Sequence, residues 1–273
     1  MPVRQLGLEA HVAMSDAATG IRRGQDGEAQ GCRAGAFFDL DRTLISRATP
    51  IALAATFRRW RLLRRRDLMR ALAWQLIFLL PGFRESAVRR ATEDGMVLLR
   101  DVPVEAVEEL LAEAMESVLR PLVYEEPLAL MREHHARGEP VYLVSASLDQ
   151  IVRHIADDLG FDDAIGSTCE VVDGVYTGRS LRPCYGPFKA HAVAEFAERD
   201  GIDLASSTAY SDSHTDLALL EAVGHPTAVN PDPRLAAIAT SRGWPVLKFV
   251  KLAGRRDAVP APTDRSHELR SRP

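Results

Sequence analysis

The chain has 273 residues, of which 46% are hydrophobic and 26% charged, and its formal net charge is -4. This is the composition of an ordinary globular protein, with room for one α/β domain or for a core domain with a smaller insert. The acidic balance argues against general affinity for nucleic acid, which usually requires a basic surface.

The N-terminal segment and the cysteines bear on the compartment. The first thirty residues carry charge throughout and lack the apolar core of a secretion signal. The longest uncharged apolar run, residues 71–80, is about half as long as a membrane span needs. The spacings of Cys32, Cys169 and Cys184 match neither a disulfide framework nor a Cys-x-x-Cys metal site. We therefore expect a cytoplasmic protein.

The two ends of the chain are predicted to be disordered tails. Residues 1–34 show no sustained hydrophobic period, and residues 255–273 are polar and contain proline. The rest is predicted to form two domains. These are an α/β core of residues 35–46 and 138–254, and a helical cap of residues 47–137.

The first predicted strand, residues 36–38, ends in acidic and hydroxyl side chains. Successive side chains of a strand point to opposite faces, so Asp39 and Asp41 share a face while Leu40 points into the core. In an open parallel sheet, ligands bind beyond the carboxyl ends of the strands. This strand end, with Thr43 two residues further on, is therefore a candidate catalytic site.

The segment between Thr43 and Ser145 has a helical pattern throughout. Thr49 and Pro50 form a helix start, with Thr49 as N-cap and the proline at the first helical position. Apolar residues recur at helical spacing over residues 104–119. About a hundred residues are far more than the dozen that a crossover between parallel strands needs. We therefore expect a separate cap domain.

Helices and strands alternate after a second buried strand, residues 141–147, which ends in hydroxyl side chains. A helix over residues 148–159 is expected to stop at Gly160, a typical C-terminal signal. The pair Asp173-Gly174 is typical of a two-residue hairpin turn.

The next predicted helix, residues 187–199, carries Lys189 in its first turn. The strand that follows, residues 207–211, leads directly into Asp212 and Asp216. The last two expected strands are residues 225–230 and 245–250. This alternation predicts an α/β fold with a doubly wound parallel sheet and right-handed crossovers.

These strand ends resemble, in order, the four motifs of the haloacid dehalogenase superfamily, whose first motif is Asp-x-Asp-x-Thr. The segments that carry the resemblance are residues 39–43, 141–147, 186–189 and 209–216. The helical cap between the first and second motifs is similar to that of the phosphoserine-phosphatase-like branch, subclass IB. The resemblance covers residues 35–250 and implies a Rossmann-like core with phosphatase activity.

The resemblance implies roles for the candidate residues. Asp39 would attack phosphorus and form an aspartyl-phosphate. Asp41 would protonate the departing alkoxide and then deprotonate the hydrolytic water. Thr43 would orient Asp41 or its loop, and Lys189 would stabilise charge during transfer. The residues implied in binding the substrate phosphate are Thr43, Ser145, Ala146 and Lys189.

The acidic residues of these motifs would need a cation. Each pair of like charges costs on the order of 4 kcal/mol at a separation of about 4 Å near a protein surface. Mg²⁺ prefers oxygen ligands and typically binds through one or two carboxylates, waters and substrate phosphate. The resemblance implies Mg²⁺ held by Asp39, the backbone carbonyl of Asp41, and Asp212, with Asp216 and Thr215 in support.

Single positions bear on the substrate. Superfamily members that displace halide lack the second acid, so Asp41 favours cleavage of a phosphoester. Phosphoserine phosphatases carry a glutamate nine residues after the nucleophile, where this chain has Ala48, and this weakens the assignment to phosphoserine. Arg42 stands where those enzymes commonly have a small residue, and Thr215 stands where an asparagine is usual in them. The expected reaction is Mg²⁺-dependent hydrolysis of a small phosphorylated metabolite.

A cluster of seven arginines within residues 58–70, beside Trp60 and Trp74, leaves alternatives open. A solvated face of the cap is favoured over weak contact with a membrane surface. Membrane contact would suit a lipid-phosphate or phosphoethanolamine-type substrate. It would also suit a membrane-surface or regulatory binding protein whose phosphatase site has decayed, although the four filled catalytic positions argue against decay.

Three histidines stand near these features. His134 and His135 precede a predicted helix end at Gly138 and are expected to be solvated, because histidines suit the negative end of the helix dipole. His214 lies within the fourth motif, where contact with substrate and a structural role both stay open.

Overall fold

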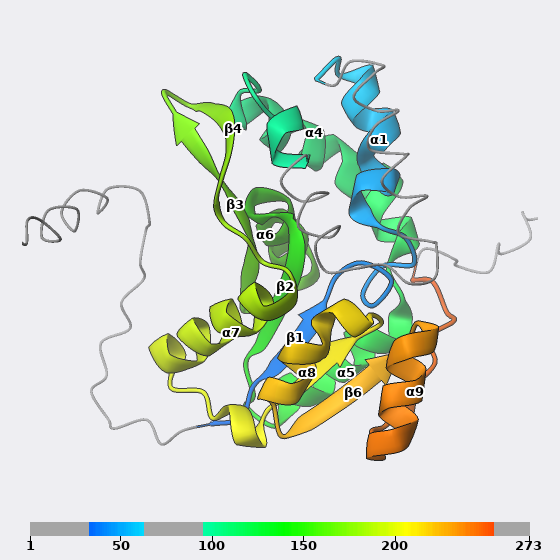
Figure 1. Ribbon diagram of the computed structural model, residues 1–273. Coiled ribbons are helices and arrows are strands. Elements are labelled where there is room, and N and C mark those ends of the chain that lie inside the picture. The colour runs from blue at the N-terminus through cyan, green and yellow to red at the C-terminus, as the bar shows by residue number, and fades with distance from the viewer. Residues whose placement is uncertain (1–32, 63–94, 254–273) are drawn as a thin grey trace, which may run out of the picture. The chain divides into compact units, whose positions relative to one another are not determined.

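A computed structural model describes residues 33–62 and 95–253 of the chain. Within these residues, seven strands form one sheet in the order β4-β3-β2-β1-β5-β6-β7 (Figure 1). The strands are β1 (Ala36–Asp39), β2 (Val141–Leu148), β3 (Asp163–Val172), β4 (Val175–Arg182), β5 (Thr208–Ser211), β6 (His225–Val229) and β7 (Val246–Leu247). The predicted doubly wound α/β sheet is confirmed.

The register of the central strands brings the motif residues to one edge of the sheet. β1 runs parallel to β2 on one side and to β5 on the other. Asp39 pairs with Val144, and Phe38 pairs with Tyr210. Ser145 and Asp212 therefore lie within a residue or two of Asp39 along the sheet, at the carboxyl ends where ligands bind.

The outer strand β4 departs from the parallel pattern, because a hairpin joins it to β3 in antiparallel pairing. The turn is the predicted Asp173-Gly174 pair, whose φ angles of 50° and 77° lie in the left-handed region. Beyond this turn, backbone bonds tie the hairpin to the segment before α4: Asp101 N donates to Tyr176 O, and Val104 N donates to Gly174 O.

Helices cover both faces of the sheet (Figure 1). They are α1 (Thr49–Arg59), α4 (Val104–Ala114), α5 (Glu125–Ala136), α6 (Asp149–Leu159), α7 (Gly186–Asp200), α8 (Leu217–Ala222) and α9 (Pro233–Arg242), with a π-helical turn at Met115–Leu119 and 3₁₀ turns at Arg120–Leu122, Leu204–Ser206 and His214–Asp216. Phe37 packs in the cluster formed with α7, α8 and α9, whereas Phe38 packs in the cluster that includes α5 and α6. Alternation along β1 thus places one phenylalanine in each of the two core layers.

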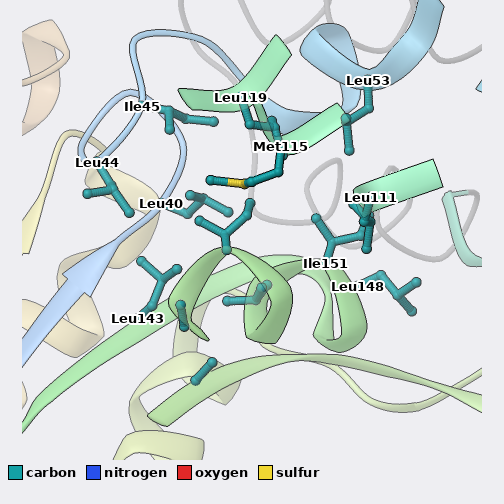
Figure 2. Packing of buried hydrophobic residues seen from close by; sticks show 14 of the residues in the cluster. Leu40, Leu44, Ile45, Leu53, Leu111, Met115, Leu119, Leu143, Leu148 and Ile151 are labelled. Carbon is teal, nitrogen blue, oxygen red and sulfur yellow. The ribbon is translucent and has the colours of Figure 1, made fainter. Parts of the chain in front are cut away.

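Apolar side chains join the first helices of the predicted cap to the sheet domain. Leu53 of α1, Leu111 of α4 and Met115 belong to the same buried cluster as Leu143 of β2 and Ile151 of α6 (Figure 2). The loop residues that follow Asp39 lie among them, as the labels of Leu40, Leu44 and Ile45 in Figure 2 show. The described part of the inserted segment is therefore packed on the core, and the division into two domains stays a prediction.

Helix α5 was expected within the cap segment, yet it packs against the sheet through His134. The expectation of a solvated His134 is wrong, because this side chain is 2% exposed and contacts the Tyr210 hydroxyl through Nε2 at 2.8 Å. Its Nδ1 lies 2.5 Å from a Glu139 carboxylate oxygen. His135 lies on the outer side of the helix, where it pairs with Asp162.

Most element boundaries follow the sequence signals. α6 ends at Gly160, whose φ of 86° is the left-handed conformation that favours glycine. α1 begins at Thr49 itself, so Ala48 takes the N-cap position instead. β7 is shorter than expected because the backbone of Phe249 exchanges hydrogen bonds with the side chain of Asn230 in place of a strand partner.

Several expectations fall partly or wholly on residues outside the described ranges. These include both predicted tails, except that Arg33 is bonded to Gly201 and Asp203 of the core. They also include Arg64, Arg65, Arg66, Arg70 and Trp74 of the arginine cluster. Within the cluster's described residues, Arg59 and the Trp60 indole both bind Glu113. No helix among the described residues combines the length and hydrophobicity needed to cross a membrane.

Candidate active site

A sharp turn after β1 presents the first two motif carboxylates. The backbone N–H groups of Leu44 and Ile45 both donate to the Leu40 carbonyl, each at 3.0 Å. Arg42 lies within this turn at a φ of 65°, a left-handed conformation that costs energy for any residue with a Cβ atom. Such strain is typical of segments that position functional groups.

Lys189 lies in the first turn of α7, as expected, and is buried between two carboxylates. Its Nζ donates to Asp39 Oδ1 at 2.5 Å and to Asp216 Oδ2 at 2.7 Å. The Ser211 hydroxyl also donates to Asp216 Oδ2, at 2.7 Å. Burial of Lys189, which is 2% exposed, acts to lower its pKa, but the charges of Asp216 and Asp39 together outweigh burial and raise the pKa above the usual range.

The pKa of Asp39 is raised to about 7 because burial disfavours its charged form. The positive charge of Lys189 acts in the opposite direction, while the charges of Asp216 and Asp41 add to the upward shift. Asp39 thus lies near the boundary between its neutral and ionised forms at neutral pH. Additional positive charge at this site would favour the carboxylate, which is the form able to act as a nucleophile.

Asp41 is bound by the start of helix α1. Its Oδ1 accepts a hydrogen bond from the Thr49 backbone N–H at 2.6 Å and another from the Thr49 hydroxyl at 2.5 Å. Burial raises the pKa of Asp41, and the two bonds from Thr49 partly offset this shift. The sequence pattern identified Thr49 as a helix start but not as a partner of Asp41.

Asp212 follows β5 and faces the same charge cluster. Its pKa is raised well above the usual range, first by burial and then by the charges of Asp39 and Asp216, whereas Arg42 acts in the opposite direction. Among the described residues, its carboxylate has no hydrogen-bond or ion-pair partner, although the side chain is only slightly exposed. Asp212 thus offers two carboxylate oxygens to a cation, and no cationic side chain of the described residues binds them.

The residues expected to bind phosphate lie at the same edge of the sheet. Ser145 is buried, and its Oγ accepts a hydrogen bond from Ser147 N, which leaves its own proton available for donation. Ala146 is half-buried beside it. The Thr43 hydroxyl is buried without a hydrogen-bond partner among the described residues, so the expected orienting bond from Thr43 to Asp41 is not seen.

The remaining fourth-motif residues make local contacts. His214 Nδ1 lies 2.8 Å from Asp232 Oδ2, and the His214 backbone N–H donates to the same oxygen, which favours the structural role. The Thr215 hydroxyl lies 3.0 Å from that of Ser213 at the start of the 3₁₀ turn. Asp216 is thus the residue of this turn that reaches Lys189.

The donor set fits a hard divalent cation. Within the described ranges, no three His, Cys, Asp or Glu side chains are grouped as a metal site, and the expected set contains only two carboxylates, those of Asp39 and Asp212. Among the described residues, each of these carboxylates has at least one oxygen without a partner. Burial raises the pKa of both, and the charge of Asp39 raises the pKa of Asp212 further. Oxygen donors with excess negative charge are what Mg²⁺ prefers.

Comparison with known proteins identifies the class. The model of the haloacid dehalogenase-like hydrolases matches residues 36–221. The chain therefore belongs to this family of hydrolases, and its relatives place it among the family's phosphatases of the phosphoserine-phosphatase-like type.

Three similar proteins come from bacteria. The chain is 40% identical to "Probable phosphatase Rv3661" of Mycobacterium tuberculosis, over 87% of this chain and 83% of the relative. It is 37% identical to "Inhibition of morphological differentiation protein" of Streptomyces azureus, over 84% and 83%. It is 32% identical to "Phosphoserine phosphatase SerB1" of Mycobacterium tuberculosis, over 79% and 71%.

Solved structures agree on the fold. A protein of unknown function from Bordetella pertussis Tohama I is 30% identical, covers 79% of this chain and 98% of its own, and superposes with a TM-score of 0.70. A substrate-bound phosphoserine phosphatase, 20% identical over 79% of this chain and 92% of its own, gives a TM-score of 0.57. The latter supports the fold alone.

Proposed function

We propose that this phosphatase hydrolyses a small phosphorylated metabolite in a Mg²⁺-dependent reaction, with an aspartyl-phosphate on Asp39 as intermediate. The observation that carries the proposal is the buried contact between Lys189 and Asp39, with Asp41 two residues further along the same turn. A carboxylate held beside an ammonium ion, at the end of the central strand, has the position that a nucleophile requires.

The first step would transfer the phosphoryl group to the enzyme. An Asp39 carboxylate oxygen forms a bond to phosphorus while the ester P–O bond breaks. The departing alkoxide takes a proton from Asp41, whose raised pKa favours the protonated form. Lys189 stabilises negative charge on the transferred group, together with hydroxyl donors such as those of Ser145 and Thr43.

The second step would release phosphate. Asp41, now ionised, accepts a proton from the attacking water, whose oxygen forms a bond to phosphorus while the bond between phosphorus and the Asp39 oxygen breaks. Both residues thereby return to their starting forms. When bound by Asp39, Asp212 and the Asp41 carbonyl, Mg²⁺ would offset the carboxylate charge and stabilise the charge that develops on the phosphoryl oxygens.

The proposed substrate class is narrower than membership of the family alone implies. Relatives named phosphoserine phosphatase support a small phosphomonoester, whereas Ala48 disfavours phosphoserine itself. A lipid-phosphate or phosphoethanolamine-type substrate is the alternative, and no observation among the described residues favours it. The close contacts among Asp39, Lys189 and Asp216 support an active site over a decayed one.

The test is turnover of a generic aryl phosphate and of a phosphometabolite panel with and without Mg²⁺. Acid quenching during turnover should trap phosphate on the peptide that contains Asp39. No turnover of any phosphomonoester, by a folded protein in the presence of Mg²⁺, would contradict the proposal.

A further inference from the structure

The contact between Asp41 and helix α1 joins residues that lie eight positions apart in the chain. Thr49 is the first residue of the helix and is 1% exposed. Both of its donors, the backbone N–H at 2.6 Å and the hydroxyl at 2.5 Å, bind the same carboxyl oxygen, Oδ1. No bond to Oδ2 of Asp41 is seen among the described residues.

The helix itself needs this carboxyl group. The N-cap residue, Ala48, has no side chain that could satisfy the free N–H groups of the first turn, and the first turn contains no acidic residue. The Asp41 carboxyl group supplies the missing acceptor from outside the helix, at the end where the helix dipole favours negative charge. The bond therefore stabilises both the helix start and one orientation of Asp41.

The two bonds also distinguish the carboxyl oxygens chemically. In a protonated carboxyl group, one oxygen carries the proton and the other is a carbonyl oxygen that accepts hydrogen bonds. An oxygen that already accepts two donors is the carbonyl oxygen, so the proton resides on Oδ2. Rotation of the carboxyl group would exchange the two oxygens, and Thr49 opposes this rotation.

The position of Thr49 is fixed by packing. Leu53, one turn further along α1, is buried in the cluster that contains Leu44 and Ile45 of the catalytic turn (Figure 2). Phe57, two turns along, belongs to the same buried cluster. The helix start and the turn that carries Asp41 are thus held against each other by apolar contacts as well as by the two hydrogen bonds.

We infer that Thr49 is a positioning residue for Asp41: its two donors hold Oδ1 so that Oδ2 delivers the proton to the leaving group. The inference rests on the proposed function, because it assigns a proton to Asp41. It goes beyond that function by naming a residue of the inserted segment on which the acid step depends, while nucleophilic attack by Asp39 does not depend on it.

The test uses single-turnover rates, so that the first phosphoryl transfer is measured rather than hydrolysis of the intermediate. Thr49→Val removes the hydroxyl and keeps the shape, Thr49→Ser keeps the hydroxyl, and Thr49→Cys repeats the test with a weak donor if the valine variant does not fold. Thr56→Val is the matched control, because Thr56 is buried on the same face of α1, seven residues from Thr49.

Thr49→Val should lower the rate on an alkyl phosphate such as glycerol phosphate by about tenfold, the effect of losing one hydrogen bond to an ionisable group. The rate on p-nitrophenyl phosphate, whose leaving group needs no acid, should change by less than about twofold. Thr49→Ser should retain most of the alkyl phosphate rate, and KM should be unaffected throughout.

Equal losses on the two substrates would overturn the inference, as would the same substrate-dependent loss in Thr56→Val. Failure of Thr49→Ser to restore the alkyl phosphate rate would also overturn it. These outcomes leave the proposed function standing, since wild type would still turn over both substrates. No turnover of either substrate by wild type would instead remove the proposed function and the inference together.

Discussion

Replacing Lys189 by methionine would test the charge balance of the site. The lysine ammonium lies 2.5 Å from Asp39 and 2.7 Å from Asp216, and its side chain is 2% exposed. Removing one partner from a buried ion pair typically destabilises a protein by about 3–5 kcal/mol, because a charge is left buried without compensation. Methionine is similar in length, so most of the loss should be electrostatic.

The loss should depend on pH in a defined direction. Asp39 has a pKa of about 7 in the folded protein against 3.8 for a free side chain, and the charge of Lys189 holds this pKa down. Without Lys189 the pKa rises further, so the folded state binds more protons than the unfolded state over a wider range. Stability then falls as pH increases. The destabilisation should be smaller near about pH 5, where Asp39 is neutral and only the pair with Asp216 is lost, and approach its full value near about pH 8.

Thermal unfolding at these two pH values, in excess chelator, measures the effect without contributions from metal binding. Lys248→Met, at an exposed lysine, is the control for the loss of a positive charge. A change of 1 kcal/mol corresponds to roughly 2–4 °C in Tm for a chain of this size, so the shift at the higher pH should be roughly 6–20 °C. A loss below about 1 kcal/mol, or one that is equal at both pH values, would refute this account.

Three further predictions test the roles of single residues. Asp39→Asn should leave the fold intact but remove the nucleophile, so turnover above about a thousandth of wild type in a stringently purified sample would contradict its role. Chelation should abolish activity and Mg²⁺ restore it, with Asp212→Ala raising the Mg²⁺ concentration required; full wild-type activity at verified negligible metal content would eliminate this mechanism. Burial lowers the pKa of His134, so the unfolded chain takes up a proton near about pH 6.5 before the folded protein does, and stability should fall below that pH. His134→Gln should flatten this fall in thermal unfolding, and an unchanged pH slope would show that His134 does not cause it.

The residues at the strand ends could be predicted because their placement follows from local rules. The buried run of β1 puts Asp39 at the carboxyl end of the strand, and parallel pairing then brings the ends of β2 and β5 to the same edge. The position of Lys189 could be predicted from the signals of a helix start, and the hairpin could be predicted from the pair Asp173-Gly174. Each of these features depends on a few neighbouring residues and on the common direction of the strands.

The environment of His134 could not be predicted by the same means. The sequence near Gly138 correctly indicated a helix end, where solvated histidines are common. Which side of the helix faces the sheet depends on how α5 packs, and the partner Tyr210 lies 76 positions away in the chain. Contacts between residues so far apart are set by the tertiary arrangement, which the helical period alone does not determine.

The bond between Asp41 and Thr49 lies between these two cases, because the sequence indicated both residues but not the contact between them. Sheet register alone places Asp39 beside its neighbours, because β1 is paired on both sides. Asp41 lies beyond the paired residues, in the turn, so no strand partner fixes its carboxyl group. Its orientation depends on the start of the inserted segment, which supplies both hydrogen bonds. In the proposed mechanism, the core sheet therefore positions the nucleophile Asp39 and the insert positions the acid Asp41. Sequence changes near Thr49 should then alter the choice of leaving group before they affect attack on phosphorus.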